Sequence, residues 1–200
     1  MKLPNLTTKN DQGKDTILVK HKSEDDEHAF IAESIVSHNV ERNQIFILAR
    51  TNRQLKELSN HLSLKKIKHV LKTDETTHTV EAKPDEVVLA TIHAIKGMEA
   101  DVVYLIGATQ NYFPCKASEH PILAFIKEED YNKEEEEKRL FYVALSRARK
   151  SLIISYFGKN TTRYINSHMA NMMKTLKMDI MPKLETNNNN NNNNNNKSSN

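Results

Sequence analysis

Apolar residues along this chain follow two patterns, and each pattern predicts one kind of element. Five short runs are almost continuously apolar, which is typical of strands buried on both faces of a sheet. Between them lie polar segments in which apolar residues recur at helical spacing. The predicted strands cover residues 16–19, 45–49, 87–91, 101–106 and 152–156. Buried strands that alternate with helices predict an α/β fold, with a parallel sheet covered by helices on both faces.

The first two predicted helices have recognisable starts or faces. Ser23 is expected to cap a helix, because Asp26 stands three positions later and can return the bond. The helix that follows the strand at 45–49 has leucines at helical spacing on one face. These leucines are Leu55, Leu58 and Leu62.

A third helix is predicted from the acidic stretch at 132–137, whose carboxylates suit the positive end of a helix. It is expected to end near Arg149 and Lys150, where basic residues suit the negative end. A short fourth helix is expected within 161–168.

The composition limits how much of the chain can fold. Only 38% of the 200 residues are hydrophobic and the mean hydropathy is −0.67, largely because of an asparagine run that cannot join a core. We therefore expect a disordered segment at 1–15, a folded domain at 16–168, an extension at 169–186 and a disordered tail at 187–200.

Several classes of protein are excluded at this point. No run approaches the ~18 apolar residues of a membrane span, and the start lacks the apolar block of a secretory signal. The single cysteine, Cys115, favours a reducing compartment, cytoplasm or nucleus. The histidines show no metal-ligand spacing, so we expect no metal to be bound by this chain alone. The net charge of +3 leaves any nucleic-acid role to particular residues.

Polar and cationic residues follow the predicted strands, where parallel sheets bind ligands. Arg50 follows the strand at 45–49. Thr91 ends the strand at 87–91 and is followed by His93, Lys96 and Glu99. Both segments and the end of the third helix are expected to meet at the same edge of the sheet. Arginine is the side chain that best matches a phosphate, although Arg50 alone is more typical of a surface ion pair. The further candidates are His93, Lys96, Gly97, Glu99 and Arg147.

Three of these segments resemble motifs of the UvrD/Rep/PcrA helicases of superfamily 1. Residues 88–105, with the core Thr91-Ile92-His93-Ala94-Ile95-Lys96-Gly97-Met98-Glu99, resemble motif V. Residues 135–150, including Tyr142-Val143-Ala144-Leu145-Ser146-Arg147-Ala148, resemble motif VI. Residues 46–52 are similar to motif IV and stand in the same order. The resemblance covers residues 16–167, and the short spacing between motifs IV and V is similar to that of helicase IV-like members.

The resemblance implies a RecA-like sheet of the P-loop NTPase class, and the second of two such domains. In the family, the first domain carries the phosphate-binding loop and the acidic pair that holds Mg²⁺; neither motif occurs in this sequence. ATP hydrolysis is therefore expected only when a first RecA-like domain acts in cis or in trans.

The resemblance also implies individual roles. Toward ATP, Arg147 would be an arginine finger, Arg50 a second phosphate cation, Glu99 a ribose ligand and Gly97 a point of close backbone approach. Glu99 also fits a carboxylate that stabilises a helix start.

Toward single-stranded DNA, the resemblance implies backbone contacts from Thr91, His93 and Lys96. His93 fits a structural histidine equally well, and Lys96 could instead cap a carbonyl. Tyr142 is expected in the core. The acidic and basic residues of 133–138 are expected to form a solvated helix entrance.

The function implied is that of the C-terminal motor domain of an ATP-dependent, 3′-to-5′ DNA helicase. The alternative is a stand-alone or vestigial module that binds DNA or a partner without ATPase activity, since the phosphate-binding loop is missing.

Overall fold

Seven strands form one parallel sheet in the computed structural model of the chain, which describes residues 16–73, 81–95, 97–115 and 132–177. The sheet order is β3-β4-β2-β5-β6-β1-β7, and every neighbouring pair is parallel. The predicted fold class is confirmed. The strands are β1 (Ile17–His21), β2 (Ile45–Ala49), β3 (His69–Lys72), β4 (Val87–Thr91), β5 (Ala100–Leu105), β6 (Ala148–Phe157) and β7 (Lys174–Lys177).

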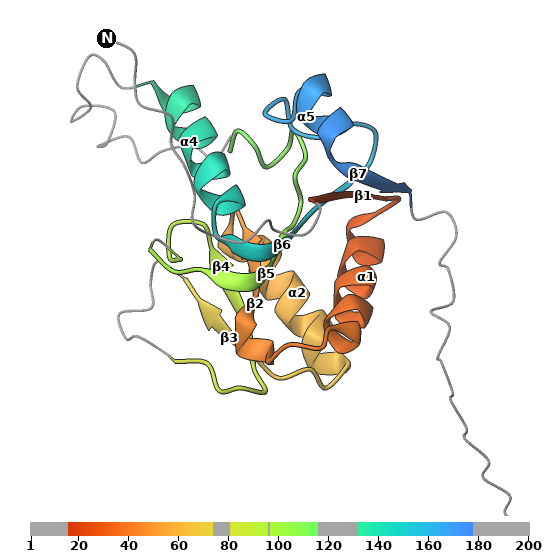
Figure 1. Cartoon of the computed structure of the whole chain (residues 1–200), viewed down its shortest axis with the longest axis vertical. Helices are drawn as coiled ribbons and strands as arrows, with labels where there is room; N and C mark the ends of the chain where they lie inside the picture. The colour runs from red at the N-terminus through yellow and green to blue at the C-terminus, as the bar shows by residue number, and fades with distance from the viewer. Residues whose placement is uncertain (1–15, 74–80, 96, 116–131, 178–200) are drawn as a thin grey trace, which may run out of the picture.

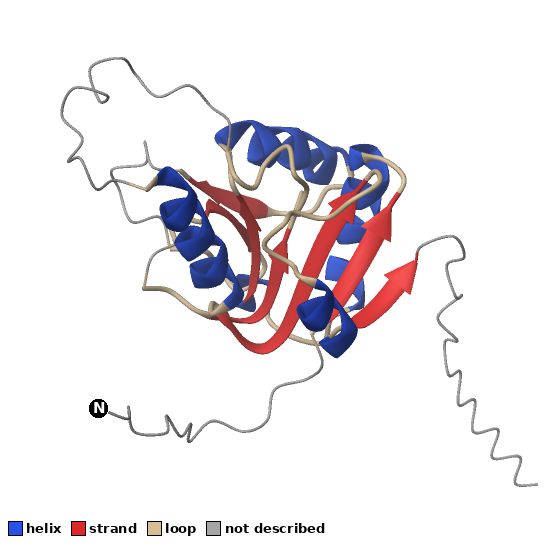
Figure 2. Cartoon of the chain, turned by 90° about the horizontal axis from the view of Figure 1, so that it is seen from above, coloured by secondary structure: helices blue, strands red, loops and turns tan. Residues whose placement is uncertain are grey.

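Helices cover both faces of this sheet (Figures 1 and 2). Strand β2 divides the core, because Ile45 and Ile47 pack with α1 and α2 while Phe46 and Leu48 pack on the α4 side. The strand is fully buried, which explains its unbroken apolar run. The helices are α1 (Glu24–Ser37), α2 (Asn52–Leu64), α4 (Lys133–Leu145) and α5 (Ser167–Met172), with a 3₁₀ turn, η1 (Arg42–Gln44).

The predicted starts of the first two helices are confirmed, and each is capped by a residue that bonds a partner three positions later. The Ser23 hydroxyl accepts a hydrogen bond from the Asp26 amide and so caps α1, and the Asp26 carboxylate accepts one from the Ser23 amide. Thr51 caps α2 in the same way with Gln54. The capping boxes fix both helix starts three residues after the end of a strand, α1 after β1 and α2 after β2.

The predicted end of the third helix is wrong. Helix α4 ends at Leu145, and Arg149 and Lys150 already belong to β6. Both side chains bind the Asp101 carboxylate on β5, at 2.9 Å and 2.7 Å. A cross-strand acid thus neutralises the charges that the sequence pattern assigned to a helix end.

The helix predicted within 161–168 is also misplaced, since α5 covers Ser167–Met172. Strands β3 and β7 were not predicted. They form the two edges of the sheet, and β3 is only half-buried, so it lacks the continuous apolar run of a central strand.

Some expectations fall on residues that the structure does not describe. These are the segment 1–15, the asparagine-rich tail and Lys96. Within the described ranges, no helix is long and apolar enough to cross a membrane.

Candidate functional site

Arg50, directly after β2, forms an ion pair with Glu137 of α4. Its Nε donates to the two carboxylate oxygens at 3.1 Å and 3.0 Å, and its Nη2 also donates to Oε1. The Glu137 side chain is 4% exposed and accepts a further bond from the Cys115 backbone amide at 3.0 Å. The pair therefore joins the carboxyl end of β2 to α4 and to the segment after β5.

The electrostatics keep this pair charged at neutral pH. Burial alone would raise the pKa of Glu137, but hydrogen bonds from Arg50 and the Cys115 amide outweigh it. The pKa of Glu137 therefore lies below its ordinary value. The charge of His93 acts in the same direction, which places His93 near this carboxylate.

Thr91 and His93 stand at the same edge, at the carboxyl end of β4, in different environments. The Thr91 side chain is buried, and its hydroxyl accepts a bond from the Ala94 amide at 3.1 Å. It stabilises the turn that follows the strand. His93 is exposed on that turn.

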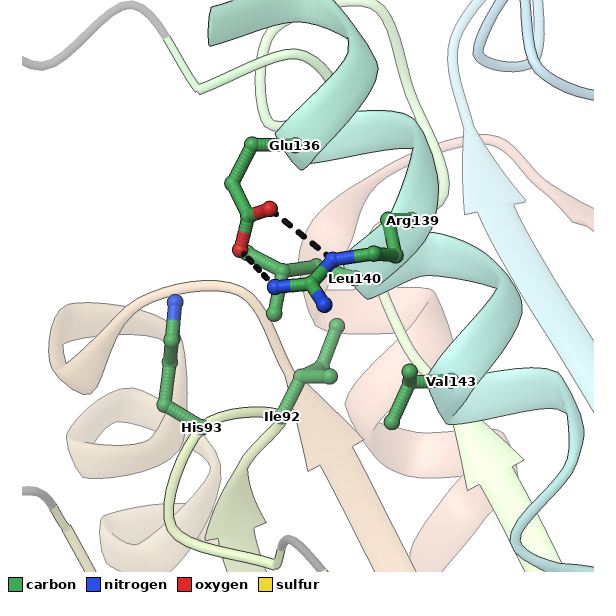
Figure 3. Close-up of a pocket in the computed structure, with 6 residues that line it drawn as sticks. All are labelled: Ile92, His93, Glu136, Arg139, Leu140 and Val143. Atoms are coloured by element: carbon green, nitrogen blue, oxygen red, sulfur yellow. Dashed lines mark hydrogen bonds and ion pairs between the residues drawn. The ribbon is translucent and has the colours of Figure 1, made fainter. Parts of the chain in front are cut away.

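A shallow pocket of about 130 Å³ opens beside His93 (Figure 3). His93 lies on one side, and α4 supplies the other wall. Glu136 and Arg139 form an ion pair at the rim, with distances of 2.9 Å and 2.8 Å. The remaining lining is apolar: Ile92, Leu140 and Val143. The pocket thus combines an apolar floor with polar groups at its mouth.

Arg147 lies at the opposite edge of the sheet. Its carbonyl accepts a bond from the Ala100 amide at 3.0 Å, and Ala100 pairs with Ala148. These two residues are the first of β5 and β6, so Arg147 stands at the amino ends of the strands.

The Arg147 guanidinium binds neutral acceptors only, in the hydrogen bonds that the structure gives it. Nε donates to the Val143 carbonyl at 3.0 Å, and Nη1 donates to the Met98 carbonyl at 3.3 Å. Nη2 donates to the Ser146 hydroxyl at 2.9 Å. The side chain is thereby held against the segment just before β5.

Gly97 and Glu99 flank Met98 in that segment, and both are exposed. Gly97 has a φ of +83°, which favours glycine. A β-carbon there would meet no atom within 4 Å, so the residue serves the backbone conformation rather than close packing. Arg147, Gly97 and Glu99 therefore form one group, which we call the amino-edge group.

The expectation that all these segments meet at one edge is wrong. Arg50, Thr91 and His93 lie at the carboxyl edge, and we call them the carboxyl-edge group. Helix α4 runs back from that edge to the other, and Glu137 and Leu145 are about 12 Å apart along it. The segment after Thr91 crosses the same face to reach β5, which carries Gly97 and Glu99 away from His93.

Comparison with known proteins identifies the family. Residues 68–159 match the family model of the UvrD-like helicase C-terminal domain. The chain contains a UvrD-like helicase C-terminal domain. The matched segment includes the amino-edge group and Glu137, while Arg50 lies outside it.

The relatives of this UvrD-like domain are much longer proteins. The chain is 38% identical over 85 residues to a probable DNA helicase II homologue of Mycoplasma capricolum, covering 42% of this chain and 10% of the relative. It is 28% identical over 139 residues to that of Mycoplasma pneumoniae, covering 70% and 18%. The ATP-dependent DNA helicase PcrA of Staphylococcus epidermidis is 33% identical over 97 residues, covering 48% and 12%.

Solved structures share the fold of the UvrD-like domain at low identity. The C-terminal domain of a possible DNA helicase from Lactobacillus plantarum superposes with a TM-score of 0.57 at 18% identity, covering 83% of this chain and 86% of that one. The Escherichia coli DEAD-box protein SrmB gives 0.57 at 10%, covering 86% and 93%. These matches support the RecA-like sheet of helicase C-terminal domains.

Two residues of the UvrD-like domain differ from expectation. Glu137 is buried on the domain-facing side of α4, so the interpretation of 133–138 as a solvated entrance is wrong for this residue. The signal was its spacing with Phe141 and Ala144, which are the other buried residues of the helix. Tyr142, expected in the core, is 42% exposed because it points away from that face.

Proposed function

We propose that this chain is the second RecA-like motor domain of an ATP-dependent DNA helicase that moves 3′ to 5′. The observation that carries the proposal is the UvrD-like domain together with the amino-edge group, in which Arg147, Gly97 and Glu99 of two separate motifs come together. A first RecA-like domain would bind ATP against this group.

Arg147 is the proposed arginine finger. It presently donates to carbonyl and hydroxyl oxygens, which are neutral acceptors. A phosphate oxygen forms charge-assisted bonds that are about twice as strong as neutral ones, so the guanidinium can exchange these partners for a γ-phosphate. Glu99 would contact the ribose, and Gly97 would allow the backbone to approach the nucleotide.

Asp101, the acid on β5 beside Arg147, does not fit a Mg²⁺ site. Asp101 holds Arg149 and Lys150, and its pKa is lowered, chiefly by the hydrogen bond from Lys150. Mg²⁺ prefers carboxylate oxygens that are not already neutralised by cations. We therefore assign Mg²⁺ to the first RecA-like domain.

The carboxyl-edge group is the proposed track for single-stranded DNA. His93 is exposed beside a pocket with an apolar floor, which suits a backbone contact next to an unstacked base. Thr91 would act by holding the turn, and Lys96 would add a further backbone contact. Because Arg50 lies at this edge, we assign it to the DNA track rather than to the γ-phosphate.

The ATP half of the proposal is tested with a polypeptide that contains both motor domains. Its native size is first established by immunoblot with an antibody against residues 130–156. Arg147→Ala should lower DNA-stimulated ATPase activity by about 10³-fold or more, because an arginine finger stabilises the charge of phosphoryl transfer. Arg149→Ala, two positions later at the start of β6, is the matched control. Undiminished ATPase activity in Arg147→Ala would refute this assignment.

The DNA half is tested with this chain alone. It should bind single-stranded oligonucleotides, and the affinity should fall steeply with salt. DNA binding without ATPase activity in any complex would favour the alternative of a binding module. Absence of binding at low salt would count against a DNA track in this domain.

A further inference from the structure

One face of α4 forms a wall of the pocket beside His93. The residues that α4 supplies recur at three- or four-residue spacing, so they share that face: Glu136, Arg139, Leu140 and Val143. Leu140 and Val143 are half-buried and pack against the core. Ile92, in the turn after β4, is 1% exposed and completes the apolar floor. Core packing therefore fixes the floor of the pocket, whereas the polar side chains at its rim reach solvent.

The size of the pocket determines what it can hold. Its volume is about 130 Å³, whereas sites for whole small molecules measure roughly 300–1,000 Å³. The pocket is therefore too small for a free nucleotide, and it suits one planar group that enters while the rest of the ligand stays outside. A base of a single strand is such a group, because its faces pack on apolar side chains while its sugar and phosphates remain in solvent.

The ion pair at the rim of the pocket is easily opened. The side chains of Arg139 and Glu136 are 70% and 33% exposed, and an exposed pair at this spacing stabilises a helix only slightly. Glu136 also lies in the first turn of α4, where the positive end of the helix stabilises its charge. Arg139 can therefore leave Glu136 without exposing the fold to an uncompensated buried charge.

A phosphate is a suitable new partner for Arg139. Its Nε and Nη2 donate to the two carboxylate oxygens of Glu136 at 2.9 Å and 2.8 Å, and the same planar fork matches two oxygens of a phosphate. Figure 3 shows Arg139 and His93 on opposite sides of the pocket. A strand whose base occupies the pocket must pass its backbone over the rim, so its flanking phosphates meet a hydrogen-bond donor there.

We propose that this pocket takes one unstacked base of single-stranded DNA, and that Arg139 exchanges Glu136 for a phosphate next to that base. The inference rests on the proposed DNA track and adds two side chains of α4 to it. Glu136 holds Arg139 in place while no strand is bound. When a strand arrives, the Glu136 carboxylate competes with the phosphate for Arg139 and repels the backbone, so it limits the affinity for DNA.

The first test uses the unmodified full chain and two strands of equal length and charge. One is oligothymidylate, and in the other every base is replaced by an abasic residue. Oligothymidylate should bind about tenfold more tightly, because only it can place a base in the pocket. A strand that carries 5-iodouracil should photocrosslink to residues 92–93 or 136–143. Equal affinities for the two strands, or crosslinks that map only elsewhere, overturn the pocket and leave the DNA track standing. Absence of binding to either strand at low salt overturns both.

Two variants at the rim test the exchange of partners. Arg139→Gln should weaken oligothymidylate binding about tenfold and reduce the slope of log affinity against log salt by about 0.7, the value for one phosphate contact. Glu136→Gln should strengthen binding about threefold, because the competing carboxylate is removed. Lys138→Gln and Glu135→Gln are the matched controls, since they change the charge equally at exposed positions of α4 that do not line the pocket. Effects no larger than those of the controls overturn the exchange.

Discussion

Arg50 and Arg147 occupy opposite edges of one sheet, and their partners differ in kind. Arg50 binds a carboxylate that is 4% exposed, whereas Arg147 binds two main-chain carbonyls and a hydroxyl. A buried ion pair is costly to break because it leaves an uncompensated charge. Neutral acceptors are easily replaced by water or phosphate. The Arg50 guanidinium therefore stabilises the fold as well as standing at the proposed DNA track, whereas the Arg147 guanidinium is available for chemistry.

The sharpest test of this contrast removes Glu137. Glu137→Ala should lower the free energy of unfolding by about 3 kcal/mol, because Arg50 and the Cys115 amide both lose their buried acceptor. Arg147→Ala should cost only about 1 kcal/mol. Urea denaturation of the full chain measures both values.

Glu136→Ala is the matched control, because Glu136 belongs to the same helix and pairs with Arg139 at an exposed position. Its cost should stay within about 0.5 kcal/mol. Equal losses of unfolding free energy in the Glu136 and Glu137 variants would show that the Arg50–Glu137 pair stabilises the fold no more than an exposed ion pair does.

The stability of the domain should also depend on pH through Glu27, which lies at the carboxyl edge of the sheet beside Gly107. Glu27 is 1% exposed, and its Oε1 accepts bonds from the Gly107 amide at 3.0 Å and the Ser155 hydroxyl at 2.6 Å. Burial raises the pKa of Glu27 from 4.5 to about 7. The folded state thus favours the protonated form, and its stability should fall by roughly 3 kcal/mol as pH rises from about 4.5 through 7.

Glu27→Gln should remove this dependence and make the chain more stable than the unmodified protein at pH 8. Denaturation midpoints across pH measure it, with the exposed Glu33→Gln on the same helix as control. An unchanged slope above pH 5 in Glu27→Gln would place the titration elsewhere. His21 works in the opposite direction, since burial lowers its pKa to about 4 and its stabilisation is lost as pH falls from 6.5 through 4.

The DNA assignment of Arg50 predicts a smaller effect. Arg50→Lys keeps a cation for Glu137 but loses the planar fork, so single-stranded DNA affinity should fall about tenfold at constant salt. ATPase activity at saturating DNA, in a two-domain polypeptide, should change only a few-fold. A loss of ATPase activity as large as that in Arg147→Ala would indicate that Arg50 contacts the γ-phosphate instead. Oligonucleotide titration and steady-state hydrolysis separate the two outcomes.

The smallest expected effect concerns the cations beside Arg147. Asp101→Asn should reduce stability by less than about 1 kcal/mol, since the partner side chains of Arg149 and Lys150 are 46% and 65% exposed. The loss should shrink at high salt. A loss as large as that of Glu137→Ala would erase the difference between the two edges.

Much of the fold could be predicted because its signals are local. The central strands β2 and β4 stand at the predicted residues, and Ser23 with Asp26 marks the start of α1. The edge strands β3 and β7 escaped prediction because neither carries a continuous apolar run: β3 is half-buried, and β7 has the sequence Lys174-Thr175-Leu176-Lys177. The motifs also predicted the family, and residues 68–159 match its C-terminal domain.

The arrangement of the candidate site depends on contacts between residues that are far apart in the chain. The predicted helix continued through Arg147 to Lys150, so the turn that carries Arg147 to the amino ends of β5 and β6 was missed. The roles of Arg147, Gly97, Glu99, Thr91, His93 and Lys96 remain predictions.

By itself, the sequence determined the parallel α/β class, the helix starts and the helicase motifs, because apolar periodicity, capping and motif spacing act over a few residues. Only the tertiary structure decided which edge of the sheet each motif occupies and which charges neutralise each other. Arg50 and Glu137 are 87 positions apart in the chain, and their pairing depends on how α4 crosses the sheet. Long-range contacts of this kind are fixed by the packing of whole elements, which no local pattern records.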